Sequence, residues 1–215
     1  MRTINVLFDL DGTLVDTLPG IDYSMRATVA QVLPGVVLPV DLRPFIGPPL
    51  RKVFHLLHPS ASPEELDTLE KTFRLSYDAE GWRRSLEYPG VRETLERLQE
   101  NEVTCFVVTN KQVRISTIIL EHFGLRKFFK EIVSPDIRTP RFGCKTESLA
   151  YVITQHNLLA ADSFFVGDSQ DDARAAQDCN VAFLAATYGY GNASAQENVL
   201  GRLTQFSEVL GFLPK

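Results

Sequence analysis

Short apolar runs alternate with segments of helical periodicity along most of the chain. The apolar runs are rich in β-branched and aromatic residues and end in polar turns, which is typical of strands buried on both faces. The predicted strands are residues 4–8, 103–109, 132–133, 163–166 and 181–186. Helical spacing lies between them, for example at Val91, Leu95 and Leu98. This alternation predicts an α/β fold, in which helices cover both faces of a parallel sheet.

The segment from 17 to 86 departs from the alternation, because it has helical patterns and no apolar run typical of a buried strand. Its clearest signal is Ser62-Pro63-Glu64-Glu65, a capping box with proline at the first helical position. Apolar residues at helical spacing follow it. The sequence therefore predicts a core domain of residues 1–16 and 87–215, and an inserted all-helical cap domain of residues 17–86.

Length and charge limit the kinds of partner that the protein can have. The 215 residues suit one core domain with a modest insert, and a formal net charge of −5 leaves no basic footprint for nucleic acid. No apolar run approaches the roughly 20 residues that span a bilayer, and the first residues lack the apolar region of a signal peptide. We therefore expect a cytoplasmic monomer or homodimer that acts on a small metabolite, with no nucleic-acid or membrane partner.

The three cysteines, Cys105, Cys144 and Cys179, lie far apart and in no metal-binding spacing. An odd and sparse set indicates a reducing compartment and no disulfide framework. We predict that all three are inert small residues.

Two carboxylates follow the first predicted strand, in Asp9-Leu10-Asp11-Gly12-Thr13. In parallel α/β sheets the chemistry collects at the carboxyl ends of the strands. Two carboxylates just beyond a buried strand are costly unless a cation or hydrogen bonds satisfy them. One of the two can attack as a nucleophile while the other moves a proton.

Three further clusters suit a phosphate group and a metal ion. Thr109 and Asn110 offer a hydroxyl, an amide and backbone N–H groups at the end of another strand, and Lys145 is a lone cation that opens a helical segment. The sequence GDSQDD at 167–172 concentrates carboxylates at a third strand end, which suits Mg²⁺. Each cluster alone is typical of a turn, a helix cap or a solvated surface. Their occurrence together, each after a strand or at the start of a helix, indicates one site.

The segments FDLDGTLVD, VVTNK, the isolated Lys145 and VGDSQDD resemble the four motifs of the haloacid dehalogenase superfamily. The resemblance covers essentially the whole chain, and the first and fourth motifs are highly specific. The chain is similar to the phosphoglycolate-phosphatase-like branch, as the segments at 45–50 and 188–191 also suggest. It implies a Rossmann-like core, a helical cap and a phosphatase that acts on a small phosphate monoester, with 2-phosphoglycolate as the best guess.

The resemblance also implies a role for each motif residue. Asp9 would be the nucleophile that becomes an acyl phosphate, and Asp11 would protonate the leaving alkoxide and then deprotonate the attacking water. Mg²⁺ would be held by the Asp9 carboxylate, the Asp11 backbone carbonyl and Asp168. The transferring oxygens would be contacted by Thr109, Asn110, Lys145 and the backbone N–H groups that follow Asp9, among them that of Leu10.

Other residues would support the site or its specificity. Asp172 would orient Lys145 or a metal-bound water, Thr13 would brace the turn, and Ser169 belongs to the fourth motif. Arg51, in the cap, would suit a substrate carboxylate because it follows the turn at 47–50. An acid at Asp11 favours phosphoryl chemistry, since the dehalogenases of the family lack one there.

The third motif departs from the family pattern, because Thr146 stands where proline usually follows the lysine. Arg138, Arg141 and Lys111 are therefore alternative cations, ranked below Lys145. On the same scaffold a nucleotide or pyrophosphate hydrolase and a sugar-phosphate mutase remain alternatives. A non-catalytic binding or regulatory protein is a third, although such a protein would not need all four motifs intact.

Overall fold

The structure is a computed structural model, and it describes residues 3–191, 193 and 199–213. The chain divides into two compact units. One, the α/β unit, takes the residues up to Asp16 and those from Glu87 onward. The other, the helical unit, is Thr17–Leu86. Two short strands, β2 (Val15–Asp16) and β3 (Leu86–Glu87), pair where the chain passes between the units.

The α/β unit is built on a six-stranded sheet with the order β5-β4-β1-β6-β7-β8, in which the neighbouring strands are parallel. Its strands are β1 (Asn5–Phe8), β4 (Thr104–Val108), β5 (Phe129–Val133), β6 (Ser163–Gly167), β7 (Ala182–Ala186) and β8 (Val199–Leu203). Strand β1 lies in the interior of the sheet, between β4 and β6, and all four of its residues are buried. The polar residue that follows β1 is therefore held at the middle of the sheet's carboxyl edge.

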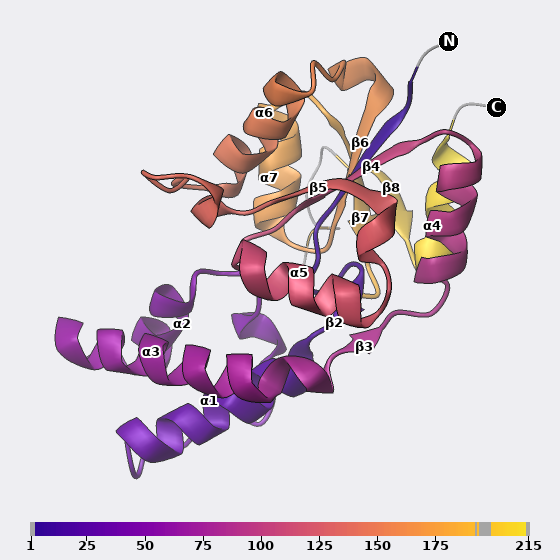
Figure 1. Cartoon of the computed structure of the whole chain (residues 1–215). Helices are drawn as coiled ribbons and strands as arrows, with labels where there is room; N and C mark the ends of the chain where they lie inside the picture. Colours follow the sequence, from indigo (N-terminus) through magenta and orange to yellow (C-terminus); the bar gives the residue numbers. More distant parts are fainter. Residues whose placement is uncertain (1–2, 192, 194–198, 214–215) are drawn as a thin grey trace. The chain divides into compact units, whose positions relative to one another are not determined.

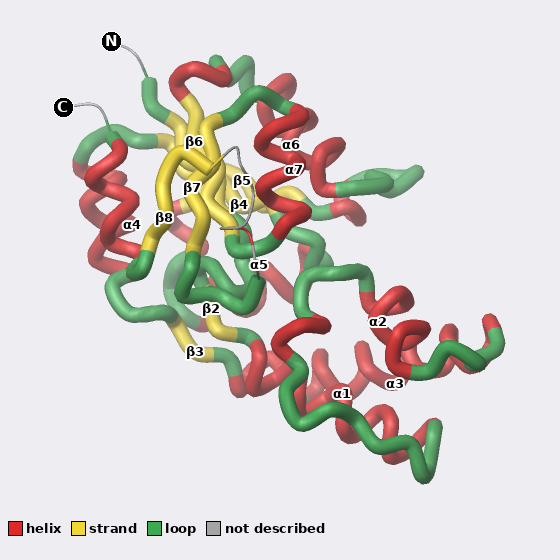
Figure 2. Tube along the Cα trace, turned by 180° about the vertical axis from the view of Figure 1, so that it is seen from behind, coloured by secondary structure: helices red, strands yellow, loops and turns green. Residues whose placement is uncertain are grey.

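Helices cover both faces of this sheet, as Figures 1 and 2 show from opposite sides. On one face lie α6 (Lys145–Gln155) and α7 (Gln170–Asp178), and on the other lie α4 (Val91–Glu100) and the 3-10 helix η7 (Phe206–Phe212). A further helix, α5 (Val113–His122), packs beside β5. Leu7 belongs to the core cluster that contains Leu149 of α6, whereas the ring of Phe8 lies 5.4 Å from that of Phe206. Successive residues of β1 thus serve opposite faces, as the strand period of two requires.

The helical unit consists of α1 (Leu18–Val32), α2 (Leu50–Leu57) and α3 (Pro63–Ala79), with 3-10 helices at Arg43–Phe45 and Gly81–Arg84. Its own core contains Met25, Val53, Phe54 and Leu69. The capping box that opens α3 is present: Glu65 N donates to Ser62 Oγ over 3.2 Å, and Ser62 N donates to Glu65 Oε2 over 2.8 Å.

The predicted fold class, a parallel sheet covered by helices and an all-helical insert, is confirmed. The errors concern the edges of the sheet. Strand β5 is longer than the predicted 132–133, and β8 was not predicted. Both are edge strands with partly exposed faces, so β5 contains Lys130 and Glu131, and β8 contains Gly201 and Arg202. These residues interrupt the continuous apolar pattern that identified the inner strands.

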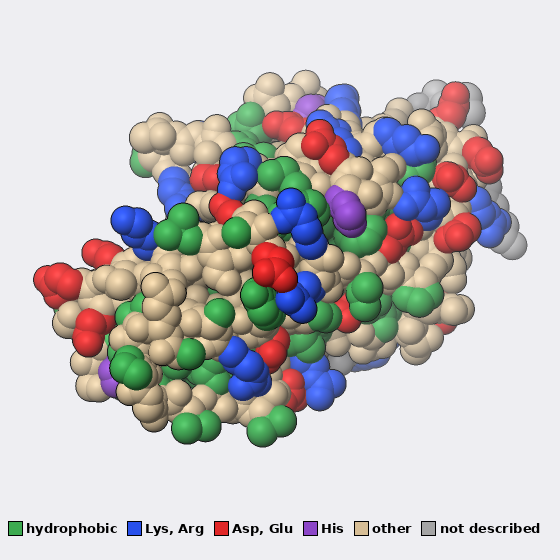
Figure 3. All heavy atoms as spheres, turned by 60° about the horizontal axis from the view of Figure 1, so that its bottom comes forward, with side chains coloured by type: hydrophobic (Ala, Val, Ile, Leu, Met, Phe, Trp, Pro, Cys, Tyr) green, Lys and Arg blue, Asp and Glu red, His purple; other side chains and the backbone are tan. Residues whose placement is uncertain are grey.

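Acidic and basic side chains are intermixed on the face of the molecule drawn in Figure 3. Among the described residues, no helix combines the length and the apolar character needed to cross a bilayer.

Candidate active site

The turn after β1 brings Asp9 and Asp11 to the carboxyl edge of the sheet. The carbonyl oxygen of Leu10 accepts three backbone N–H groups, from Thr13, Leu14 and Val15, so the chain folds back on itself directly after Asp9. Gly12 has a φ of +81°, and a Cβ there would overlap the Asp168 carboxylate. The turn therefore requires glycine, both for its backbone conformation and for the close approach of Asp168.

Lys145 forms an ion pair with Asp9 at the centre of the site. It is the first residue of α6, and its Nζ lies 2.8 Å from Asp9 Oδ1 and also forms an ion pair with Asp172. All three side chains are less than a tenth exposed. Burial alone would lower the pKa of Lys145, but the charges of Asp172 and Asp9 and their hydrogen bonds outweigh it, so the pKa lies above its ordinary value. Lys145 is therefore a permanent cation beside Asp9.

The start of α7 holds Asp172 in place. Its Oδ2 accepts hydrogen bonds from the backbone N–H of Ser169 (3.0 Å) and from the Ser169 hydroxyl (2.6 Å), and the backbone N–H of Asp172 donates back to Ser169 Oγ. This is a capping box closed by aspartate, and it leaves the other oxygen, Oδ1, to the ion pair with Lys145. The fourth motif thus serves as a helix cap and as a support for Lys145.

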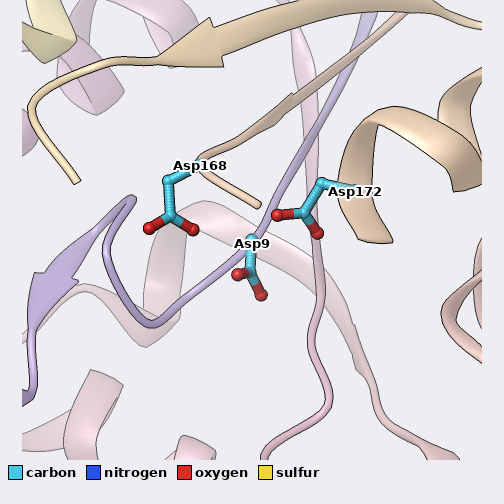
Figure 4. Close-up of side chains that lie close together, drawn as sticks. All are labelled: Asp9, Asp168 and Asp172. Atoms are coloured by element: carbon cyan, nitrogen blue, oxygen red, sulfur yellow. The ribbon is translucent and has the colours of Figure 1, made fainter. Parts of the chain in front are cut away.

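Asp168 completes a group of three buried carboxylates. Ligand oxygens of Asp9, Asp168 and Asp172 lie within 4.8 Å of one another, and Figure 4 shows the three side chains converging from the ends of β1 and β6 and from α7. Burial, opposed by Lys145 but reinforced by the other two carboxylates, raises the pKa of Asp9 to about 8. Burial and the negative charge of Asp172 raise the pKa of Asp168 to about 7.

These raised pKa values mean that the negative charge of the cluster is under-compensated. One buried ammonium faces three carboxylates, and a further cation at this point would balance them. Hard carboxylate oxygens are the ligands that Mg²⁺ prefers. The residues present therefore fit a divalent cation: oxygens of Asp9, Asp168 and Asp172 lie close enough together to share one, and of these three residues Asp172 already has partners on both oxygens.

The end of β4 lies beside this cluster, because Phe8 pairs with Val107 in the parallel register of β1 and β4. Thr109 follows and is buried, with its backbone N–H bonded to Val133 O and its Oγ1 accepting the backbone N–H of Lys111. Asn110 is half-buried in the same turn. These two residues thus occupy the edge of the sheet where Asp9 emerges.

Lys111 engages Asp11, an interaction that the sequence analysis did not foresee. Its Nζ lies 2.9 and 3.0 Å from the two carboxylate oxygens of Asp11. Lys111 had been ranked as an alternative phosphate-binding cation, and the structure instead gives it a carboxylate partner. The sequence held a weak signal, since Lys111 is the last residue of the second motif, VVTNK.

Two of the three remaining predicted cations have other partners. Arg51 lies in the helical unit at the start of α2, where it pairs with Asp67, and its role in substrate binding stays a prediction. Arg138 is exposed, donates to the carbonyl of Pro140 and packs over the ring of Phe142. Arg141 is exposed in the same loop.

The loop after β7, residues 187–191, is a part of the site whose function the sequence alone did not reveal. The backbone N–H groups of Tyr190 and Gly191 donate to Asp168 Oδ2 over 2.8 and 2.9 Å. A Cβ at Gly189 would overlap the Gly12 carbonyl, and one at Gly191 would overlap the backbone of Asp168. The alternating glycines were the available signal, because they mark a close approach of backbones.

Comparisons with known proteins agree with this geometry. Residues 6–186 match the family model described as haloacid dehalogenase-like hydrolase. A phosphoglycolate phosphatase from Pseudomonas savastanoi pv. phaseolicola is 33% identical over 201 residues, which cover 90% of this chain and 73% of that protein. A haloacid dehalogenase-like family hydrolase from Streptococcus pneumoniae has the same fold, with a TM-score of 0.88 at 24% identity over 98% of both chains. A predicted phosphoglycolate phosphatase from Haemophilus somnus superposes with a TM-score of 0.87 at 26% identity, also over 98% of both chains.

Proposed function

The chain belongs to the haloacid dehalogenase-like hydrolases, and we propose that it is a Mg²⁺-dependent phosphatase that hydrolyses a small phosphate monoester through a phospho-aspartate. The observation that carries the proposal is the buried contact between Lys145 and Asp9, beside Asp168 and Asp172. A nucleophile held against a permanent cation, within a cluster that suits a divalent metal, is what attack on an anionic phosphate requires.

In the first half of the reaction, a carboxylate oxygen of Asp9 forms a bond to phosphorus while the bond from phosphorus to the alkoxide oxygen breaks. Asp11 gives a proton to that leaving oxygen, which requires that Asp11 be protonated and its contact with Lys111 be released in the substrate complex. In the second half, Asp11 takes a proton from water as the water oxygen attacks phosphorus, and the bond to Asp9 breaks. Inorganic phosphate and free Asp9 result, so protons and electron pairs balance over the cycle.

Lys145 stabilises negative charge on the transferring phosphoryl group, and Asp172 keeps its ammonium in position. Thr109 and Asn110, at the neighbouring strand end, supply hydrogen bonds to the phosphoryl oxygens, together with the backbone N–H of Leu10. Mg²⁺, when bound by the Asp9 carboxylate, the Asp11 carbonyl and Asp168, would offset the repulsion between the nucleophile and the phosphate.

We propose 2-phosphoglycolate as the substrate. This choice is supported by the similarity of the chain to the phosphoglycolate phosphatase of Pseudomonas savastanoi, at 33% identity. Arg51 would contact the substrate carboxylate. A panel of 2-phosphoglycolate, sugar phosphates and nucleotides, assayed for phosphate release with Mg²⁺, tests this choice. A sugar phosphate converted to its isomer without phosphate release would identify a mutase instead.

Replacing the nucleophile tests the reaction itself. We expect Asp9→Asn to abolish turnover, with a loss on the order of 10⁴-fold or more, because an amide does not attack phosphorus. Circular dichroism should show an intact fold, and wild-type protein treated with EDTA should also be inactive. Wild-type rates in Asp9→Asn would exclude the proposed nucleophile.

A further inference from the structure

The 187–191 loop fixes the orientation of one proposed metal ligand. Two successive backbone N–H groups, those of Tyr190 and Gly191, donate to the same oxygen of Asp168, Oδ2. Within the described part of the chain, no hydrogen bond to Asp168 Oδ1 is seen. The carbonyl of Asp168 in turn accepts the N–H of Ala193. The position of this loop therefore decides how the Asp168 carboxylate is turned.

The loop is itself anchored by its two tyrosine side chains. The Tyr190 hydroxyl donates to Asp16 Oδ1 over 2.6 Å, and the Tyr188 hydroxyl donates to the carbonyl of Thr13 over 2.9 Å. The ring of Tyr188 also packs edge-on against Tyr88, with the centroids 5.0 Å apart. These contacts join the loop to both segments that border the helical unit in the sequence, since Asp16 immediately precedes it and Tyr88 follows it closely.

Tyr190 differs from Tyr188 because both its backbone N–H and its side-chain hydroxyl donate to carboxylates. Its backbone N–H donates to Asp168 and its side-chain hydroxyl donates to Asp16, so a single residue connects the two acids. A hydroxyl-to-carboxylate bond of 2.6 Å lies in the range of strong, charge-assisted hydrogen bonds. Partners that orient a metal-ligating carboxylate are typically worth 10- to 100-fold in metal affinity.

We infer that Tyr190 is a positioning residue for the metal, which sets the affinity for Mg²⁺ through its bond to Asp16. The inference rests on the proposed function, because it assigns Mg²⁺ to Asp168. It adds a link that the motifs do not contain: the last residue before the helical unit is connected, through Tyr190, to a ligand of the metal.

The test is Tyr190→Phe, which removes the hydroxyl and keeps the ring. We expect the Mg²⁺ dissociation constant, measured by isothermal titration calorimetry, to rise about 10-fold. The Mg²⁺ concentration for half-maximal hydrolysis of p-nitrophenyl phosphate should rise in parallel, while kcat at saturating Mg²⁺ stays within about 3-fold, because the ligands themselves are intact. Tyr23→Phe is the matched control, since it removes a tyrosine hydroxyl that donates to Glu80 in the helical unit.

The second part of the test replaces Asp16, the partner of the Tyr190 hydroxyl. Asp16→Ala should also weaken Mg²⁺ binding, and the loss in the double variant should be smaller than the sum of the two single losses, because both substitutions remove the bond between Tyr190 and Asp16. Asp16→Asn keeps an acceptor oxygen and should recover part of the affinity. Additive losses in the double variant would overturn the inference.

Two outcomes separate this inference from the proposed function. If Tyr190→Phe lowers the melting temperature in EDTA but binds Mg²⁺ as the wild type does, Tyr190 only stabilises the fold and the inference is wrong. If the wild-type protein neither binds Mg²⁺ nor releases phosphate from any ester, the proposed function is wrong and the inference falls with it.

Discussion

The two units use charged side chains in opposite ways. In the α/β unit, Lys145 pairs with Asp9 and Asp172, and the three side chains are only 4%, 8% and 0% exposed. In the helical unit, Arg51 pairs with Asp67, and these side chains are 42% and 71% exposed. Both are contacts between a cation and a carboxylate, yet one is removed from water and the other is not.

The difference in exposure separates charges that serve the chemistry of a site from charges that belong to the solvated surface. Burying three carboxylates around one ammonium is expensive, and packed apolar residues would often be more stable. The pKa of Asp9, raised to about 8 by burial, reflects that cost. A cluster that the fold does not need for its stability is best explained by chemistry. The exposed Arg51 pair costs little and contributes little, which is typical of a solvated surface.

The largest effect should come from breaking the buried pair. Lys145→Met removes the cation from Asp9 and Asp172, and we expect kcat/KM to fall at least ~10³-fold because charge on the phosphoryl oxygens loses its partner. Leaving buried carboxylates unpaired should also destabilise the fold by roughly 3–5 kcal/mol. Steady-state assays and urea unfolding measure both effects. Activity within tenfold of the wild type would contradict the role assigned to Lys145.

A smaller effect should appear in the pH dependence of the metal-free protein. The pKa of Asp9 is higher in the folded state than in the unfolded chain, so the folded state retains a proton that the unfolded state releases. The free energy of unfolding should therefore fall as pH rises from about 4 to about 8. Mg²⁺ should restore stability at the alkaline end, because it replaces the lost proton as counter-charge.

Urea unfolding in EDTA at about pH 5.5 and about pH 8.5, with and without Mg²⁺, measures this dependence. Asp9→Asn is the control, since it removes one of the two groups with a raised pKa and should make the pH dependence less steep, with Asp168 contributing the rest. Equal pH dependence in the wild type and in Asp9→Asn would show that other groups are responsible.

The smallest effect should follow loss of the exposed pair. Arg51→Met should change the free energy of unfolding by less than ~1 kcal/mol, because the ion pair with Asp67 is solvated. A larger loss would show that this pair contributes more than a surface contact. The same variant tests substrate binding: a KM that rises selectively for 2-phosphoglycolate, relative to p-nitrophenyl phosphate, would assign Arg51 to the substrate carboxylate.

Features that depend on neighbours in the chain were predictable. The apolar pattern of β1 identified a strand buried on both faces, because each of its residues contacts a protein interior. The Ser62 capping box identified the start of α3, because its two bonds join residues three positions apart. The edge strand β8 was missed, because a strand with one sheet neighbour and partly exposed residues has no continuous apolar pattern.

By itself, the sequence determined the parallel fold, the helical insert and the acidic turn after β1, since periodicity and turn chemistry are local properties. Only the tertiary structure decided which charges meet: Lys145 with Asp9 and Asp172, Lys111 with Asp11, and Tyr190 with Asp16 and Asp168. The physical reason is that such contacts depend on strand register and helix packing, which bring together residues remote in the chain. No local pattern records those distances.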